Sequence, residues 1–211
     1  MSSEDIKNVF VPGLKRGAAH LAFAPEKAYA YVEDPDAGWR VYLRSAVFIH
    51  LAGVPFRANK FIVVKKFGKQ SFAPVWEPPK GQMEGKDAGR SAKDVMDLLL
   101  ENVRRETDEE AKISNLLNVR HTGLIYQGRE NDYPPGHYFQ YHIFQAFVDP
   151  TGLQSAVNKF AWLHDHPKAW AAMRKDKREK DALGWYRPGK TGLMGRWSPS
   201  IVKMYLRANK R

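Results

Sequence analysis

The sequence of 211 residues contains no cysteine. This absence excludes disulfides, thiolate nucleophiles and zinc sites built on cysteine. Apolar residues occur only in short runs, so no segment is long enough to cross a bilayer as a helix, and no membrane contact is expected. Residues 1–7 lack a basic region followed by an apolar stretch, which argues against a secretory leader. We therefore expect an intracellular, cytoplasmic protein.

Acidic residues are scarce in the last quarter of the chain. Residues 158–211 contain 14 Lys and Arg against 4 Asp and Glu, a net charge of +10, whereas residues 1–157 carry a net charge of +1. Four of the six tryptophans lie in the basic segment: Trp162, Trp170, Trp185 and Trp197. Cations interleaved with aromatic rings suit single-stranded nucleic acid, through phosphate contacts and base stacking. The alternative is that these tryptophans anchor the segment to the core.

Hydrophobic patterning predicts strands on both sides of one long helix. Runs rich in β-branched and aromatic residues predict strands at 41–51, 61–67, 119–126 and 138–148. An apolar stripe at helical spacing predicts a helix over 91–111, and two shorter helices are expected near 167–181 and 199–209. Two prolines within 76–81 preclude a regular helix or a central strand there. The fold class is therefore α/β with a mixed sheet.

The predicted long helix carries an acidic cluster near its end. At 100° per residue, Glu106, Glu109 and Glu110 fall in one sector beside the apolar stripe. Like charges at this spacing repel each other, and a bound cation would remove the penalty. Hard divalent ions such as Mg²⁺ prefer carboxylate oxygens. The alternative is a solvated acidic face without chemistry.

Residues 81–113 resemble the signature of the Nudix hydrolases, G-x5-E-x7-R-E-U-x-E-E-x-G-U, where U is aliphatic. The matching positions are Gly81, Asp87, Arg105-Glu106, Glu109-Glu110 and Ile113. Asp87 replaces a glutamate, and Thr107 is a weak aliphatic residue. Lys112 stands where the family has glycine, a residue favoured at the end of a helix for backbone reasons. About ten extra residues separate Asp87 from Arg105.

The resemblance implies a Nudix-like α/β/α sandwich with a basic helical C-terminal extension. It divides the chain into a loosely structured N-terminal segment over 1–38, a catalytic core over 39–157, and a basic, Trp-rich helical segment over 158–211 packed on that core. It implies Mg²⁺ or Mn²⁺ bound by Glu106, Glu109 and Glu110, with Arg105 orienting these carboxylates. Glu109, Glu110, Arg105 and a general base, for which Glu130 is proposed, would form the catalytic set. Lys80, Gly81 and Tyr138 would contact the substrate.

The implied reaction is hydrolysis of a phosphoanhydride in a nucleoside-diphosphate-linked substrate. The first hypothesis is decapping of RNA, with the basic segment holding the RNA body. The second is hydrolysis of a compact anion, either a dinucleoside polyphosphate or a diphosphoinositol polyphosphate. The third is a nucleic-acid-binding protein that keeps the fold without catalysis. The complete set of three glutamates argues against the third hypothesis.

Overall fold

The computed structural model describes residues 5–22, 24–69, 74–88 and 93–210. The chain divides into two compact units, which are described separately below. Unit 1 comprises Met1–Ser45, Gly81–Asn102 and Ile125–His142; unit 2 comprises Ala46–Lys80, Val103–Leu124 and Ile143–Arg211. Five elements contribute residues to both units: β3 (Trp39–Leu51), β6 (Lys80–Gln82), α2 (Val95–Ala111), β7 (Leu117–Gly128) and β8 (His137–Val148).

Two sheets and several helices make up the fold, which confirms the α/β class with a mixed sheet. The larger sheet has the strand order β1-β2-β3-β8-β7, with β6 (Lys80–Gln82) paired to β3. The smaller sheet has the order β5-β4-β9, formed by Trp76–Glu77, Ile62–Lys66 and Lys180–Trp185. The strands predicted at 41–51, 61–67, 119–126 and 138–148 correspond to β3, β4, β7 and β8. In the part of the chain that the structure describes, no helix is long and apolar enough to span a membrane.

The N-terminal segment expected to be loosely structured over 1–38 instead contains two strands of unit 1. β1 (Lys15–Leu21) and β2 (Ala24–Asp34) pair antiparallel, with a register shift between His20 and Leu21. β1 has few apolar residues and is mostly exposed, so its hydrophobic pattern is weak. The Tyr31 ring lies over Gly17, where a Cβ would come within 2.4 Å of the tyrosine hydroxyl oxygen.

Helix α2 begins at Val95. Residues 91 and 92 of the predicted helix lie outside the described residues, and residues 93 and 94 precede the helix. Its expected apolar stripe is buried at Leu99 and Val103, and the hydroxyl of Thr107 donates to the carbonyl of Val103 at 2.7 Å. The helix ends at Ala111, and the next residue, Lys112, has a φ of 59° in the left-handed region that favours glycine. The lysine therefore adopts the backbone conformation for which the Nudix signature uses glycine.

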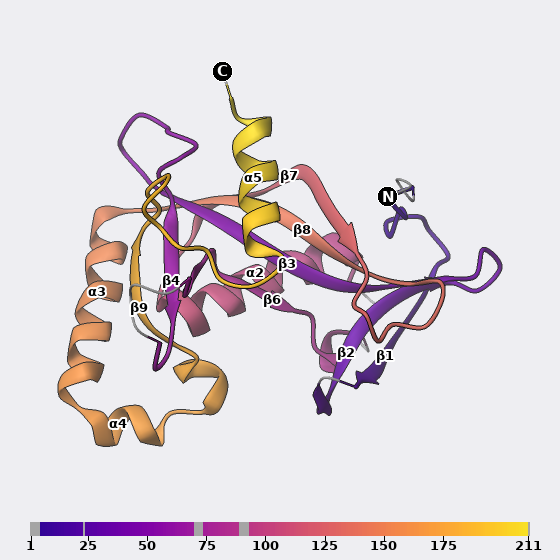
Figure 1. Cartoon of the computed structure of the whole chain (residues 1–211), viewed down its shortest axis with the longest axis horizontal. Coiled ribbons are helices and arrows are strands. Elements are labelled where there is room, and N and C mark those ends of the chain that lie inside the picture. The colour runs from indigo at the N-terminus through magenta and orange to yellow at the C-terminus, as the bar shows by residue number, and fades with distance from the viewer. Residues whose placement is uncertain (1–4, 23, 70–73, 89–92, 211) are drawn as a thin grey trace. The chain divides into compact units, whose positions relative to one another are not determined.

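Unit 2 contains four helical segments after β8: α3 (Pro150–Asp165), α4 (Pro167–Ala172), η1 (Lys175–Arg178) and α5 (Ser198–Ala208). α3 begins with a proline after Asp149, whose carboxylate accepts from the Gly152 amide at 2.8 Å. It packs beside β9, which runs along β4 (Figure 1). The domain boundary predicted between 157 and 158 falls inside α3, which runs continuously from Pro150 to Asp165. α5 covers the helix predicted at 199–209.

The C-terminal helix packs through its apolar face within unit 2. Ile201, Val202 and Tyr205 are buried, and the Tyr205 ring stacks on Phe48 with centroids 3.7 Å apart. The Ser198 hydroxyl does not cap this helix but donates to Oε2 of Glu77 at 3.4 Å. The start of α5 is thereby tied to a buried carboxylate of β5.

Candidate functional site

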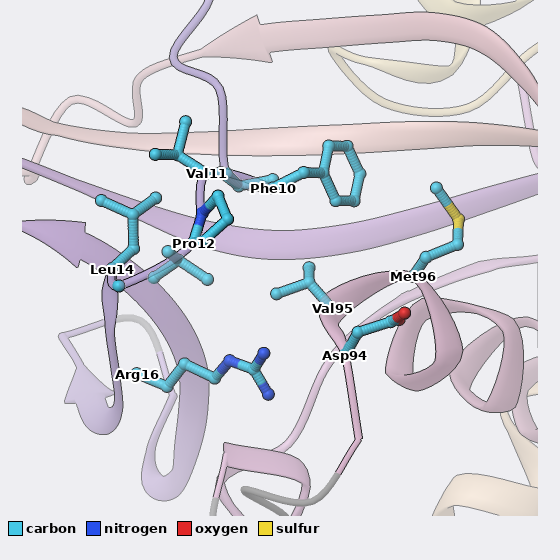
Figure 2. Close-up of a pocket in the computed structure, with 11 residues that line it drawn as sticks. Phe10, Val11, Pro12, Leu14, Arg16, Asp94, Val95 and Met96 are labelled. Atoms are coloured by element: carbon cyan, nitrogen blue, oxygen red, sulfur yellow. The ribbon is translucent and has the colours of Figure 1, made fainter.

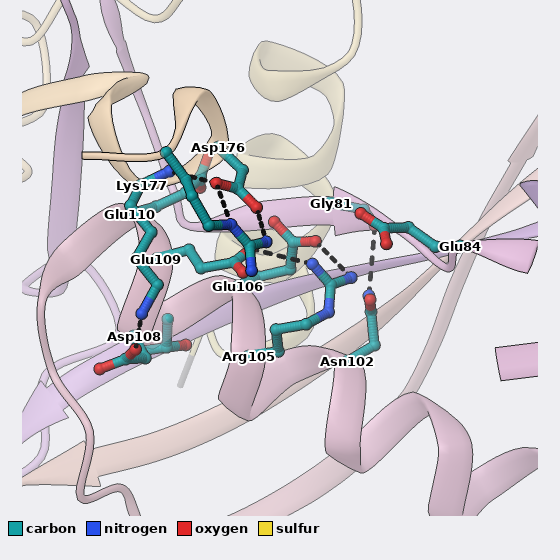
Figure 3. Close-up of polar contacts among 12 residues, drawn as sticks. Gly81, Glu84, Asn102, Arg105, Glu106, Asp108, Glu109, Glu110, Asp176 and Lys177 are labelled. Atoms are coloured by element: carbon teal, nitrogen blue, oxygen red, sulfur yellow. Dashed lines mark hydrogen bonds and ion pairs between the residues drawn. The ribbon is translucent and has the colours of Figure 1, made fainter. Parts of the chain in front are cut away.

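Two carboxylates of α2 share one guanidinium in unit 2. Arg105 contacts Oε1 of Glu106 at 2.8 Å and Oε2 of Glu109 at 2.9 Å (Figure 3). The Glu106 and Glu109 side chains are mostly buried. We call Arg105, Glu106 and Glu109 the Arg105 cluster. When both carboxylates are ionised, the cluster holds two negative charges against one positive charge, and Arg105 contacts both of them.

The neighbouring carboxylates change the pKa of Glu106. Burial raises the pKa of Glu106, Arg105 acts in the opposite direction, and repulsion from Glu110, Glu109 and Glu179 brings the pKa to about 8. A carboxyl group in this environment gains from a bound cation. Mg²⁺ and Mn²⁺ sites built from one or two carboxylates, completed by water and phosphate oxygens, fit such a pair. Glu106 and Glu109 are therefore suitable ligands for a divalent ion.

Glu110 faces a different environment from its neighbour Glu109. Its Oε1 lies 2.8 Å from the ammonium of Lys180, and its Oε2 accepts from the backbone amide of Lys80 at 3.0 Å. The expected set of three glutamates therefore does not converge on one point. Among residues 5–22, 24–69, 74–88 and 93–210, no three acidic or histidine side chains are arranged to hold a metal ion. Glu106 and Glu109 lie together at Arg105, whereas Glu110 pairs with Lys180, and the predicted set of three metal ligands stays a prediction.

Glu110 belongs to a second group of charges, the Lys180 cluster, formed by Glu77, Lys80, Glu110 and Lys180. The Lys180 ammonium lies 2.5 Å from Oε1 of Glu77, and the Lys80 ammonium lies 3.0 Å from Oε2 of Glu77. Burial acts to raise the pKa of Glu77, but the two ammonium groups outweigh it and lower the pKa to about 2. Burial likewise acts to lower the pKa of Lys180, but Glu110 and Glu77 hold it above its ordinary value. Burial raises the pKa of Glu110, and Lys180 acts in the opposite direction. When all four groups are ionised, two negative charges face two positive charges.

The remaining predicted site residues include three that lie in unit 1. Glu130 forms an ion pair with Arg44 at 2.9 Å, and the Arg44 guanidinium lies 4.2 Å from the centroid of the Phe139 ring. Tyr138 is 8% exposed, and Gly81 accepts from the Asn102 side chain at 3.5 Å. The ion pair gives Glu130 a structural role in unit 1, and its role as a general base stays a prediction. The proposed substrate contacts of Gly81 and Tyr138 also stay predictions.

Two further residues of the motif have local structural roles. Asp87 is buried in the short helix α1 (Gly85–Ala88), and its carboxylate accepts from the Glu84 amide at 3.0 Å. Lys80, expected to meet a phosphate, directs its ammonium to Glu77 instead. The substrate contact of Lys80 therefore stays a prediction beside this internal ion pair.

Sequence analysis missed a cationic cavity in unit 2. It has a volume of about 420 Å³ and is lined by Lys66, Phe67, Lys175, Arg178 and Glu179. The Phe67 ring is exposed and lies 5.2 Å from that of Trp170, centroid to centroid. Glu179 is also one of the charges that raise the pKa of Glu106. The basic run at 174–180 was visible in the sequence, but its approach to Phe67 depends on the pairing of β4 with β9.

The tryptophans of the basic segment differ in exposure. Trp162 is 51% exposed and stacks on His166, with ring centroids 4.3 Å apart, whereas Trp170 is 8% exposed. Trp185 lies below Lys60, and Trp197 lies beside Arg196. Trp170 therefore fits the alternative in which the tryptophans anchor the segment to the core, whereas Trp162 has an exposed ring on which another group can stack.

Unit 1 contains a separate pocket of about 310 Å³ (Figure 2). Its lining is largely apolar and includes Phe10, Val11 and Val95, with Arg16 and Asp94 as charged members. The Arg16 guanidinium donates to the backbone carbonyl of Lys93, so it supports the chain at this pocket. None of the residues predicted for the site lines this pocket.

No protein-family model and no curated protein matches the chain. Similar solved structures include a NUDIX hydrolase from Nitrosomonas europaea, with 12% identity, coverage of 80% of this chain and 90% of that chain, and a TM-score of 0.44. A C. elegans Ap4A hydrolase binary complex has 13% identity, coverage of 79% and 96%, and a TM-score of 0.39. The C-terminal domain of mouse MUTYH in complex with human PCNA has 9% identity, coverage of 79% and 88%, and a TM-score of 0.41. The first carries the family name that residues 81–113 suggest; at these TM-scores the functional assignment rests on the chain's own residues.

Proposed function

We propose that this chain is a metal-dependent Nudix-type hydrolase that cleaves a phosphoanhydride bond in a nucleoside-diphosphate-linked substrate. One observation carries the proposal: the Arg105 cluster and the cationic cavity lie in the same unit and share an electrostatic environment. Glu179 lines the cavity and contributes to the raised pKa of Glu106. A phosphate chain held by the cavity therefore lies within electrostatic reach of the carboxylates.

The proposed roles follow from charge and geometry. Glu106 and Glu109 would hold Mg²⁺ or Mn²⁺, and Arg105 fixes the orientation of both carboxylates. Such an ion, when bound, neutralises a diphosphate and lowers the pKa of a water molecule. Lys175 and Arg178 would bind phosphate oxygens through charge-assisted hydrogen bonds.

The cavity favours a compact anion as substrate. Its volume of about 420 Å³ lies within the range of small-molecule sites. The exposed Phe67 ring offers a flat surface on which a nucleobase can stack, while the surrounding cations bind phosphate. A dinucleoside polyphosphate fits this chemistry best, because it combines a base with a phosphate chain. Diphosphoinositol polyphosphates share the charge but have no base to stack.

Capped RNA is the second candidate. The exposed Trp162 ring and the net charge of +10 over residues 158–211 favour it, because both can bind a nucleic-acid strand. A substrate panel with Mg²⁺ or Mn²⁺ separates the candidates: capped RNA, free cap dinucleotide, diadenosine polyphosphates and diphosphoinositol polyphosphates. Cleavage of diadenosine polyphosphates and free cap at rates equal to capped RNA supports the compact substrate. Cleavage of capped RNA alone supports the second candidate, and no cleavage of any member contradicts the proposal.

Variants of the cavity test its part in binding. Lys175→Ala and Arg178→Ala are each expected to raise KM about tenfold with little change in kcat, because each removes a charge-assisted hydrogen bond. Lys203→Ala is the matched control, since Lys203 is an exposed lysine of α5 that does not line the cavity. A KM equal to that of the control variant would remove the cavity from the proposed function.

A further inference from the structure

The Lys180 ammonium lies between two buried carboxylates. It is 2.5 Å from Oε1 of Glu77 and 2.8 Å from Oε1 of Glu110, and all three side chains are at most 5% exposed. Two carboxylates this close together out of water repel each other unless a cation separates them. In unit 2 that cation is a side chain of the protein.

All four carboxylate oxygens of this arrangement are engaged. Oε2 of Glu77 faces the Lys80 ammonium at 3.0 Å, and Oε2 of Glu110 accepts from the Lys80 backbone amide at 3.0 Å. The Lys180 cluster contains two negative and two positive charges, so its net charge is zero. A divalent ion added here would create an excess of two positive charges in a buried place. Metal binding at Glu110 therefore requires the removal of Lys180.

The backbone fixes the position of the ammonium. Lys180 is the first residue of β9, and β9 pairs with β4 in a register that places Lys180 opposite Lys66. Glu77 lies in β5 on the other side of β4, opposite Val64. The cation and its first carboxylate thus project from neighbouring strands of one three-stranded sheet, and Glu110 approaches from α2. Backbone pairing of β9 with β4 therefore restrains the Lys180 side chain more than a lysine on a solvent-exposed surface would be restrained.

We infer that Lys180 is a tethered cation that fills the place of a metal ion between Glu77 and Glu110. Divalent metal is thereby directed to the Arg105 cluster, where two carboxylates face a single guanidinium. The inference rests on the proposed function only for the ion at the Arg105 cluster. The exclusion of metal from Glu110 depends on Lys180 alone and can be measured without a substrate.

Counting bound Mn²⁺ by electron paramagnetic resonance tests the inference on the full chain. Lys180→Met keeps an unbranched apolar stem, one heavy atom shorter than that of lysine, and removes the charge. We expect this variant to hold one Mn²⁺ more per chain than the unaltered protein, and its melting temperature to rise on addition of Mn²⁺. Lys177→Met is the matched control, because Lys177 pairs with Asp108 at 3.4 Å on a partly exposed face. The control is expected to bind the same number of ions as the unaltered protein.

Each outcome bears on one of the two claims. An unchanged Mn²⁺ count in folded Lys180→Met overturns the inference, as does a second ion already bound by the unaltered protein. If Lys180→Met folds only when Mn²⁺ is present, the inference is supported. If Lys180→Met does not fold at all, the number of Mn²⁺ ions bound by the unaltered protein decides, and one ion or none supports the inference. No Mn²⁺ in the unaltered protein with one ion in Lys180→Met contradicts the metal site of the proposed function and supports the tethered cation.

Discussion

Glu109 and Glu110 are consecutive glutamates of α2 that lie in opposite electrostatic environments. Glu109 shares one guanidinium with Glu106, so the Arg105 cluster has one carboxylate more than it has cations, and the pKa of Glu106 rises to about 8. Glu110 belongs to the Lys180 cluster, in which two carboxylates face two ammonium groups. Removing one charge from a buried balanced cluster is costly, whereas a cluster with a carboxylate in excess can bind a cation. The balance of local charges, more than residue type, separates the two roles.

The largest expected effect follows from breaking the balanced cluster. Lys180→Met leaves Glu77 and Glu110 buried without their shared cation, and we expect a loss of about 3–5 kcal/mol in the free energy of unfolding. Chemical denaturation in metal-free buffer measures it. Lys177→Met should lose less than about 1 kcal/mol, because its ion pair is partly exposed. Equal losses for the two variants would show that the Lys180 cluster is not a special feature of the core.

The second prediction separates the two glutamate environments by activity. Glu106→Gln is expected to reduce kcat/KM by about 100-fold or more while the melting temperature stays the same or rises, because a metal ligand and a source of repulsion are both removed. Glu110→Gln is expected to lower the melting temperature instead, because Lys180 loses one of its two carboxylates. Turnover on the best substrate of the panel and thermal melts measure both effects. The opposite pattern would assign the metal to Glu110.

A third buried group, His50, extends the comparison to a side chain without an ionic partner. Its Nδ1 donates to the Lys60 carbonyl at 2.9 Å, its Nε2 accepts from the Tyr205 hydroxyl at 2.8 Å, and burial lowers its pKa to about 4. The unfolded chain takes up this proton near pH 6.5, so stability is complete above that pH and falls as the pH decreases towards 4. The loss is at most about 3 kcal/mol, from about 2.5 pH units.

Denaturation curves collected between pH 4 and pH 7 measure this dependence. His50→Gln is expected to be less stable at pH 7 but to show a flatter pH profile, because it has no group that titrates in this range. The difference between the two profiles isolates His50 from the other histidines. Parallel profiles for the two proteins would show that His50 is protonated at the same pH in the folded and unfolded chains.

The smallest expected effect concerns the end of α2. Lys112 has a φ of 59°, and its ammonium donates to the carbonyls of Glu109 and Lys177. Both Lys112→Ala and Lys112→Gly lose these hydrogen bonds, but only glycine removes the steric cost of the left-handed conformation. Lys112→Gly should therefore be more stable than Lys112→Ala by about 1 kcal/mol, measured by denaturation. Equal stability would mean that the helix ends differently in solution.

The sequence predicted the elements with strong hydrophobic patterns and failed where structure depends on distant pairing. Strands β3, β4, β7 and β8 and helix α2 were predicted because their apolar residues recur at strand or helix spacing. β1 was missed because a strand of KRGAAHL is stabilised by backbone pairing with β2 more than by burial. Helical spacing correctly placed Glu106, Glu109 and Glu110 on one helix. It could not show that Lys180 lies beside Glu110, because no local pattern relates positions so far apart.

The register of β9 on β4 has a consequence for the order in which the chain can be completed. Lys180 follows Glu77 by 103 residues, so during synthesis Glu77 and Glu110 leave the ribosome well before their shared cation. Until β9 is made and docks, burial of the Glu110 carboxylate is unfavourable because its cation is missing, and the smaller sheet lacks its third strand. Pairing of Glu110 with Lys180 and completion of this sheet then occur together, which couples the docking of β9 to the burial of charge.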